Sequence, residues 1–162
     1  MRVQTERFGE IVVDQNEIIS FPQGLLGFDD YTKFVIIEQP DSYFLFLQST
    51  EEQSLAFVLV KPELIRSDYQ VSLEGNSVKE LEFHSADEGK VFAIVTIPEN
   101  ITDMTANLQA PLVINTRNNL AKQVVLMEGN YHTRHNVLAE FQRTAFEGQK
   151  QAKSKQDVRK TV

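Results

Sequence analysis

The chain has 162 residues, of which 41% are hydrophobic, and a formal net charge of −7. This length predicts one domain with its own hydrophobic core, and the absence of cysteine excludes disulfides, thiolate metal sites and thiol nucleophiles. The N-terminal segment lacks the apolar run of a signal peptide, and no apolar stretch approaches the ~20 residues of a membrane helix, so we expect a cytoplasmic protein without membrane partners.

Charge is distributed unevenly along the chain. Positions 148–162 contain five Lys or Arg and one Asp, whereas positions 1–147 contain 11 basic and 22 acidic residues. We expect a single acidic domain over 1–147, and a basic polar tail over 148–162 that is frayed or disordered because it has too few apolar residues to offset its ordering entropy. An acidic surface repels nucleic acid and attracts basic partners, or it serves solubility alone.

Eight runs rich in β-branched and aromatic residues are predicted to be strands. The connections Gln39–Ser42 and Ser49–Ser54 are too short for a crossover between parallel strands, so they predict antiparallel hairpins. Many runs are apolar on both faces, which favours a mainly β fold, either a small closed antiparallel β-barrel or a barrel-like sandwich. The predicted strands are Arg2–Glu6, Glu10–Val13, Phe34–Glu38, Tyr43–Gln48, Leu55–Val60, Val91–Ile97, Ala106–Asn115 and Lys122–Met127.

Two helical segments accompany the predicted strands. Within 67–90, the spacing Ser77-x-x-Glu80 is typical of a capping box and predicts a short helix that ends near Phe83. A second helix is predicted over Asn136–Phe146, with Asn136 as its N-cap. The apolar side chains of the first segment are expected to cover one mouth of the barrel. They are Leu73, Val78, Leu81 and Phe83.

Two connections have a clear turn chemistry. Phe21–Phe28 reads FPQGLLGF, which predicts a fixed loop whose glycines adopt positive φ and whose terminal Phe side chains enter the core. It lacks the strand, glycine spacing, helix start and lysine of a phosphate-binding loop, so no nucleotide site is expected there. Thr116–Leu120 contains Asn118-Asn119 and predicts a hairpin, because Asn tolerates the left-handed region.

Residues 105–115, TANLQAPLVIN, alternate between apolar and polar side chains. This period of two predicts a strand with Ala106, Leu108, Ala110, Leu112 and Ile114 on one dry face and an amide-rich opposite face. Because Pro111 has no N–H, we expect an edge strand, or a break or bulge at that position. From periodicity alone, the default interpretation of these neutral amides is an ordinary strand face in water, and the alternative is a surface that meets another protein.

Nothing in the sequence predicts a catalytic or metal site, and no cofactor is expected. His132-x-x-His135 would hold a metal only on a helix or with further ligands, so packing or surface histidines are the default interpretation. The acidic pairs, such as Asp29-Asp30 and Glu51-Glu52, fall in polar turns where carboxylates are normally solvated. We therefore expect no enzyme. An alternative is an RNA- or protein-binding β-barrel module that acts through the basic tail, although that tail lacks aromatic residues for stacking.

Three stretches of the sequence form a distinctive set. They are 7–11 (RFGEI) with 18–28 (IISFPQGLLGF), 47–49 (LQS) with 55–57 (LAF), and 104–115 (MTANLQAPLVIN) with 122–126 (KQVVL). Taken in this order, they resemble the flagellar assembly factor family FliW. Two positions depart from the family pattern: Leu26 and Asn136 stand where the family typically has Pro, which loosens the first loop and lets the C-terminal helix start earlier. The likeness covers about residues 1–138.

The resemblance implies a non-enzymatic switch between two protein partners. FliW-like proteins bind flagellin in the cytoplasm and also bind CsrA, a dimeric RNA-binding repressor, so that free FliW relieves repression of flagellin mRNA translation. We expect a monomer when free, with no direct binding of nucleic acid.

The strand 105–115 and the residue before it are our candidate partner-binding site. Asn107 and Gln109 are expected to supply hydrogen bonds and Met104 an adaptable apolar contact, with Thr105 and Asn115 on the same polar face. A second interpretation is that this motif is architectural and that acidic loops and the C-terminal segment contact the partners.

Overall fold

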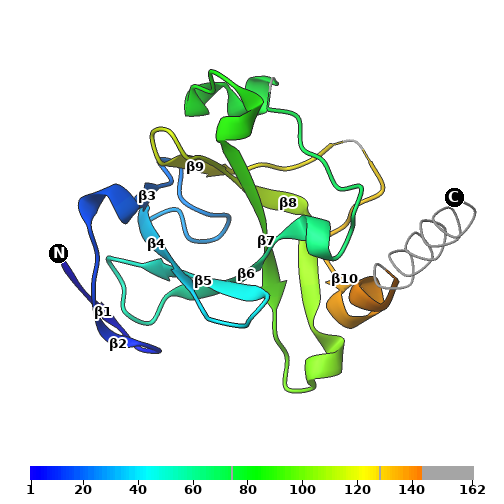
Figure 1. Cartoon of the computed structure of the whole chain (residues 1–162), viewed down its shortest axis with the longest axis horizontal. Helices are drawn as coiled ribbons and strands as arrows, with labels where there is room; N and C mark the ends of the chain where they lie inside the picture. Colours follow the sequence, from blue (N-terminus) through cyan, green and yellow to red (C-terminus); the bar gives the residue numbers. More distant parts are fainter. Residues whose placement is uncertain (74, 128, 144–162) are drawn as a thin grey trace, which may run out of the picture.

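A single sheet that closes on itself organises the computed structural model, which describes residues 1–73, 75–127 and 129–143. Within these ranges, seven strands follow one another around a barrel, and β3 meets β9 to close it (Figure 1). Neighbouring strands are antiparallel except for the parallel β3–β9 pair. The mainly β, closed-barrel fold is confirmed. The barrel strands are β3 (Ile19–Ser20), β4 (Lys33–Glu38), β5 (Phe44–Ser49), β6 (Ala56–Val60), β7 (Gly89–Thr96), β8 (Thr105–Asn115) and β9 (Leu120–Gln123).

Among the described residues, three further strands lie outside the closed ring of seven. The hairpin of β1 (Arg2–Thr5) and β2 (Gly9–Val12) packs on β4, and β10 (His135–Asn136) pairs with β8 and so extends the same sheet. All eight predicted strands are present, with ends that differ by a few residues. The sequence did not reveal β3 and β10, because a strand of two residues has no period of its own and forms only where a neighbouring strand offers hydrogen bonds.

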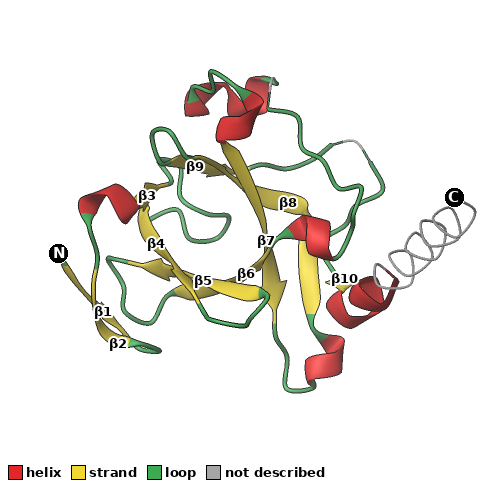
Figure 2. Cartoon of the chain, in the orientation of Figure 1, coloured by secondary structure: helices red, strands yellow, loops and turns green. Residues whose placement is uncertain are grey.

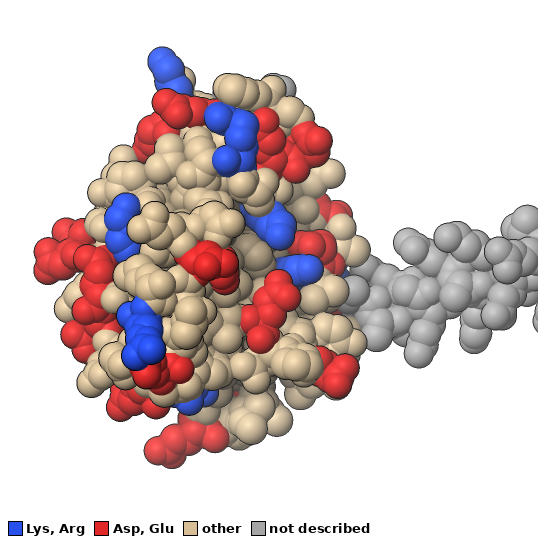
Figure 3. Space-filling view, turned by 60° about the vertical axis from the view of Figure 1, so that its left-hand side comes forward, with Lys and Arg blue, Asp and Glu red and all other residues tan. Residues whose placement is uncertain are grey.

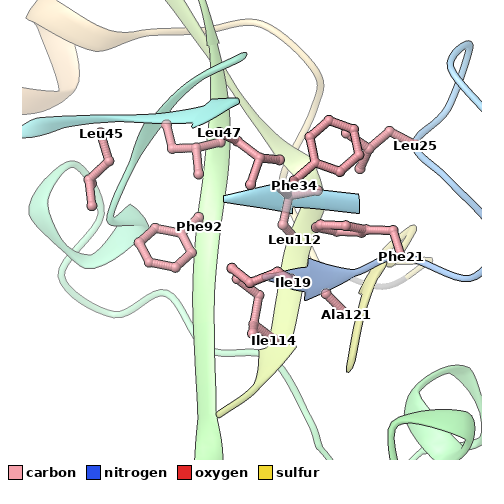
Figure 4. Packing of buried hydrophobic residues seen from close by; sticks show 11 residues of the cluster. Ile19, Phe21, Leu25, Phe34, Leu45, Leu47, Phe92, Leu112, Ile114 and Ala121 are labelled. Atoms are coloured by element: carbon pink, nitrogen blue, oxygen red, sulfur yellow. The ribbon is translucent and has the colours of Figure 1, made fainter. Parts of the chain in front are cut away.

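Side chains on both faces of the barrel strands are buried, but in different clusters. The interior holds large apolar residues, including Phe21 and Phe34, whose rings meet edge to face with centroids 5.5 Å apart (Figure 4). A second cluster lies outside the barrel, where Val60, Ala93 and Leu108 pack under neighbouring segments. This two-sided burial explains why many strands are apolar on both faces. The labelled interior residues in Figure 4 are Ile19, Phe21, Leu25, Phe34, Leu45, Leu47, Phe92, Leu112, Ile114 and Ala121.

The helical segments are short and lie on the outside of the sheet (Figure 2). In the part of the chain that the structure describes, five are 3₁₀ segments and one is an α-helix over 137–143. Within the three described ranges, no helix is both long enough and apolar enough to cross a membrane. The 3₁₀ segments are η1 (Gln15–Glu17), η2 (Pro62–Leu64), η3 (Asn76–Leu81), η4 (Ala86–Glu88) and η5 (Ile101–Asp103).

Segment η3 differs from the predicted helix in its start and in its position. Gly75, not Ser77, is its N-cap, and Glu80 accepts a hydrogen bond from the Lys122 ammonium at 2.6 Å instead of closing a capping box. Its buried side chains Val78 and Leu81 pack with Val113 on the outer side of the sheet, so the expectation that this segment covers a barrel mouth was wrong. The long-range pair with Lys122 outcompeted the local cap.

The C-terminal helix begins as predicted. Asn136 Oδ1 accepts a hydrogen bond from the Ala139 N–H at 2.9 Å, which satisfies one of the first-turn donors. Val137 is fully buried, and Phe141 packs in the same outer cluster. The last predicted residues of this helix and the tail 148–162 lie outside the described residues.

A four-residue bulge interrupts the pairing of β8 with β7. Phe92 lies opposite Leu112, but two residues later Ile94 lies opposite Asn107, so one residue of β7 faces four of β8. The bulge that Pro111 predicted is present, and β8 is not an edge strand because it has partners on both sides.

This mismatch reverses the faces of β8. Ala106 and Leu108 pack outside the barrel, whereas Leu112 and Ile114 pack inside it. The prediction of one continuous dry face was therefore wrong, although all its members are buried.

Side chains and neighbouring segments satisfy the backbone of the bulge completely. The N–H groups of Leu108 and Gln109 donate to the His132 carbonyl, and the N–H of Ala110 donates to Asn107 Oδ1 at 2.9 Å. Pro111 has no N–H to satisfy. The four carbonyls of 108–111 accept, in order, from the Tyr69 hydroxyl, the Leu126 N–H, the Gln123 side chain and the Val124 N–H. The bulge is thus a fixed element of the fold.

Replacing Asn107 with Ala should destabilise the fold by about 1–3 kcal/mol, because the Ala110 N–H would lose its acceptor in a part-buried position. Asn107→Asp is the matched control, since it keeps an oxygen at the same place. Urea unfolding at neutral pH measures both changes. Equal stability of the Ala and Asp variants would show that this side chain does not hold the bulge.

Candidate functional site

An open groove of about 600 Å³ lies at one mouth of the barrel. Its wall combines apolar side chains with hydroxyl and amide groups, and it includes one carboxylate, Asp103, and one guanidinium, Arg134. Its formal charge is therefore balanced. The groove is lined by Leu25, Leu26, Phe57, Ile94, Thr96, Pro98, Asp103, Thr105, Asn107, Gln123, Thr133 and Arg134.

The bulge in β8 places two predicted site residues in this groove. Thr105 lies opposite Thr96 and Asn107 opposite Ile94, so all four side chains share the barrel-facing side of the sheet. Without the reversal at 108–111, Thr105 and Asn107 would face outward with Val113. The groove therefore contains Thr105 and Asn107 because of the bulge, which the alternation of the sequence does not show.

The remaining predicted site residues lie elsewhere. Gln109 is half-buried beside the groove but does not line it. Met104 is 9% exposed and Asn115 is fully buried, so neither offers the surface that was expected. The Asn115 amide donates to the Leu81 carbonyl at 2.8 Å and accepts from the Arg117 N–H, which makes it a structural link between β8 and η3.

The loop 21–28 forms the facing wall of the groove. Gly24 adopts φ +67°, and a Cβ there would overlap the Cα of Asp29, so only glycine fits. Phe21 is buried as predicted, but Phe28 remains 40% exposed and packs edge to face on Phe57. Leu25 enters the core in its place. Leu26, 63% exposed, is left at the groove.

Gln123 joins the two walls. Its Oε1 accepts from the Leu26 N–H at 2.9 Å and its Nε2 donates to the Ala110 carbonyl at 3.1 Å, which fixes the loop against the bulge. The sequence analysis missed Leu26, Phe57, Ile94, Gln123 and Arg134 as groove residues. Leu26, Phe57 and Gln123 fell within the family-like stretches, but no periodicity distinguishes a groove residue from its neighbours.

A partly buried ionic network anchors the segment that carries Thr133 and Arg134. Two guanidinium nitrogens of Arg66, Nε and Nη2, donate to the Glu140 carboxylate at 3.1 and 3.0 Å, and His135 Nδ1 lies 3.3 Å from the same group. The hydrogen bond from Arg66 lowers the pKa of Glu140 below its ordinary value. This fork ties the start of the C-terminal helix to the segment after η2.

His135 is held as a neutral side chain. Its Nε2 accepts from the His132 N–H at 3.0 Å, so the proton belongs on Nδ1, which points to Glu140. Burial lowers the pKa of His135, and its ring stacks on that of His132 with centroids 3.8 Å apart. Both ring nitrogens are thus occupied by the protein. Among the described residues, no group of three His, Cys, Asp or Glu side chains could hold a metal ion.

The fold and the groove define a small closed β-barrel with an open groove of mixed polarity at one mouth. The FliW protein family model matches residues 2–137, and the chain belongs to the FliW family.

Relatives and a solved structure agree with this assignment. A protein of Alkaliphilus metalliredigens named flagellar assembly factor FliW is 48% identical over 145 residues, which are 88% of this chain and 90% of that protein. The protein of the same name from Treponema denticola is 36% identical over 141 residues, covering 87% and 96%. A crystal structure of a flagellar assembly factor FliW has a TM-score of 0.78 and 34% identity, and the match covers 85% of this chain and 96% of that one.

Acidification should destabilise the protein through His135. Because burial depresses its pKa in the folded state, the unfolded chain binds this proton more readily, and stability is lost as pH falls below the ordinary value of 6.5. The pKa of Glu140 is also lowered, so a second loss of stability follows as pH falls below the ordinary glutamate value of 4.5. Urea unfolding between pH 8 and 5 should show a slope of up to about 1.4 kcal/mol per pH unit from His135.

His135→Gln should flatten that slope between pH 6.5 and 5, because Gln has no proton to bind in this range. His84→Gln is the control, since His84 is exposed and far from the Arg66–Glu140 pair in sequence. If the His135 variant keeps the slope of the parent chain, another group causes the acid sensitivity.

Proposed function

We propose that this protein binds flagellin in the cytoplasm and also captures a CsrA-like repressor dimer, which relieves repression of flagellin mRNA translation. The free protein is a monomer and performs no covalent chemistry. Membership of the FliW family supports the flagellar role. The observation that carries the partner-binding role is the groove, whose mixed lining and balanced charge suit a segment of polypeptide.

The groove offers what a peptide segment needs. Its amides and hydroxyls can exchange hydrogen bonds with a main chain, and its apolar floor can take an aliphatic side chain. Leu26, 63% exposed at the rim, is a large apolar group left at the surface beside polar ones. Such a group supports a protein-binding surface, because its burial by a partner stabilises the complex.

The acidic character of positions 1–147 supports the second part of the proposal. Carboxylates are spread over the side of the molecule shown in Figure 3. Placed beside a basic RNA-binding protein, this charge weakens the attraction of that protein for phosphates without contact to the bases. Antagonism then has an electrostatic component in addition to any change of shape in the repressor.

Asn107→Asp combined with Gln109→Glu should weaken capture of flagellin or CsrA by about tenfold or more, because both side chains lose their N–H donors and gain negative charge. The fold should persist, since an Asp at 107 still accepts from the Ala110 N–H. Titration calorimetry measures the affinities. Gln15→Glu with Asn16→Asp is the control, because it adds the same charge on exposed residues of η1 outside the groove. Unchanged affinity for both partners would remove this strand from the site.

Salt should separate antagonism from binding. Raising ionic strength from about 0.05 to 0.3 M screens long-range charge, so the inhibition of RNA binding by CsrA should weaken while the complex with CsrA persists. Competition with a labelled RNA, run alongside calorimetry at each salt concentration, gives both quantities. An inhibition constant that does not change with salt would rule out the electrostatic component.

A further inference from the structure

The N-terminal hairpin has an unpaired edge on its second strand. In the described part of the chain, β2 pairs with β1 alone. The Val13 N–H donates to the Met1 carbonyl at 2.8 Å, which makes these two residues a hydrogen-bonded pair of the antiparallel ladder. Because hydrogen-bonded and non-hydrogen-bonded pairs alternate, the N–H and C=O groups of Glu10 and Val12 point away from β1. They have the spacing that an added strand requires.

The two faces of β2 suit different side chains of such a strand. Ile11 faces the barrel and is half-buried against the cluster of Val3, Val13 and Val35. Val12 lies on the opposite face and is 78% exposed, a large fraction for a β-branched apolar side chain in a strand. An added strand would extend the apolar cluster on one face and cover Val12 on the other.

The charges around this edge favour a basic partner. Glu6 precedes β2, Glu10 lies within it, and Asp14 and Glu17 follow it, all of them exposed. Arg2, on the neighbouring strand, lies 3.8 Å from Glu10, and Arg7 precedes β2, so residues 1–17 carry four carboxylates against two guanidinium groups. The side of the molecule that carries the hairpin is turned forward in Figure 3. β2 contains none of the lysine or proline residues that commonly protect a free edge.

We propose that the β2 edge is a docking site for an extended segment of another protein with alternating apolar and basic residues. The segment adds as a third strand beside Glu10 and Val12, and its basic side chains lie near the carboxylates of the hairpin. The β2 residues do not line the groove, so this proposal stands or fails independently of the flagellin and CsrA proposal.

A synthetic peptide of seven residues that alternates Val and Lys, acetylated and amidated at its ends, is the probe. Titrated into the full ¹⁵N-labelled chain, it should shift the amide signals of Glu10 and Val12. Two control peptides of the same sequence carry N-methyl groups, one on the odd-numbered residues and one on the even-numbered residues. Only one of these two sets of N–H groups faces the β2 edge, so one control should bind at least tenfold more weakly than the parent peptide. Equal binding of all three peptides, or shifts confined to other residues, would overturn the proposal.

Variants of Val12 test the same contact from the protein side. Val12→Pro removes an outward N–H without removing a ladder bond to β1, and should weaken peptide binding about tenfold. Val12→Thr keeps the N–H and should bind like the parent. Thermal unfolding checks that both variants fold. If the Pro variant does not fold, the N-methylated peptides test the contact without any change to the protein. Sedimentation equilibrium tests whether a second copy of this chain occupies the edge instead. A dimer that dissociates on Val12→Pro substitution would assign the edge to a second copy and overturn the proposal.

Discussion

The complete hydrogen bonding of the bulge at 108–111 is the constraint on which the candidate site depends. Four residues of β8 bypass one residue of β7, which leaves their backbone groups without ladder partners. Each of those groups finds a partner in Asn107, Tyr69, Gln123, His132 or the segment 124–126. Since an unpaired buried amide is costly, these contacts hold the bulge in one conformation. The reversal of faces that puts Thr105 and Asn107 in the groove follows from it.

The same contacts connect parts of the chain that are distant in sequence. Tyr69 comes from the segment after η2, and burial raises the pKa of its hydroxyl, so it remains a donor to the Leu108 carbonyl. His132 belongs to the segment that the Arg66–Glu140 pair anchors. Gln123 joins the loop 21–28 to the bulge. The groove is therefore bounded by fixed elements on each side, and a partner would meet a surface that is already formed.

Local sequence predicted the features that depend on near neighbours. The eight longer strands, the bulge at Pro111 and the Asn136 cap follow from backbone chemistry within a few residues. The two-residue strands β3 and β10 and the failed capping box at Ser77 do not, because each outcome depends on a residue far along the chain. For Glu80, the ammonium of Lys122 was the stronger partner, and no local pattern contains that information.

The sequence by itself determined the class of fold, since short connections and strands apolar on both faces leave a closed barrel as the arrangement that buries them. The tertiary structure decided which side chains of 104–115 are available to a partner. The alternation in this segment is regular, yet the bulge reverses its faces, buries Asn115 and leaves Thr105 and Asn107 at the barrel mouth. A period of two assigns residues to faces only within one unbroken ladder, and hydrogen bonds from distant segments determine where the ladder breaks.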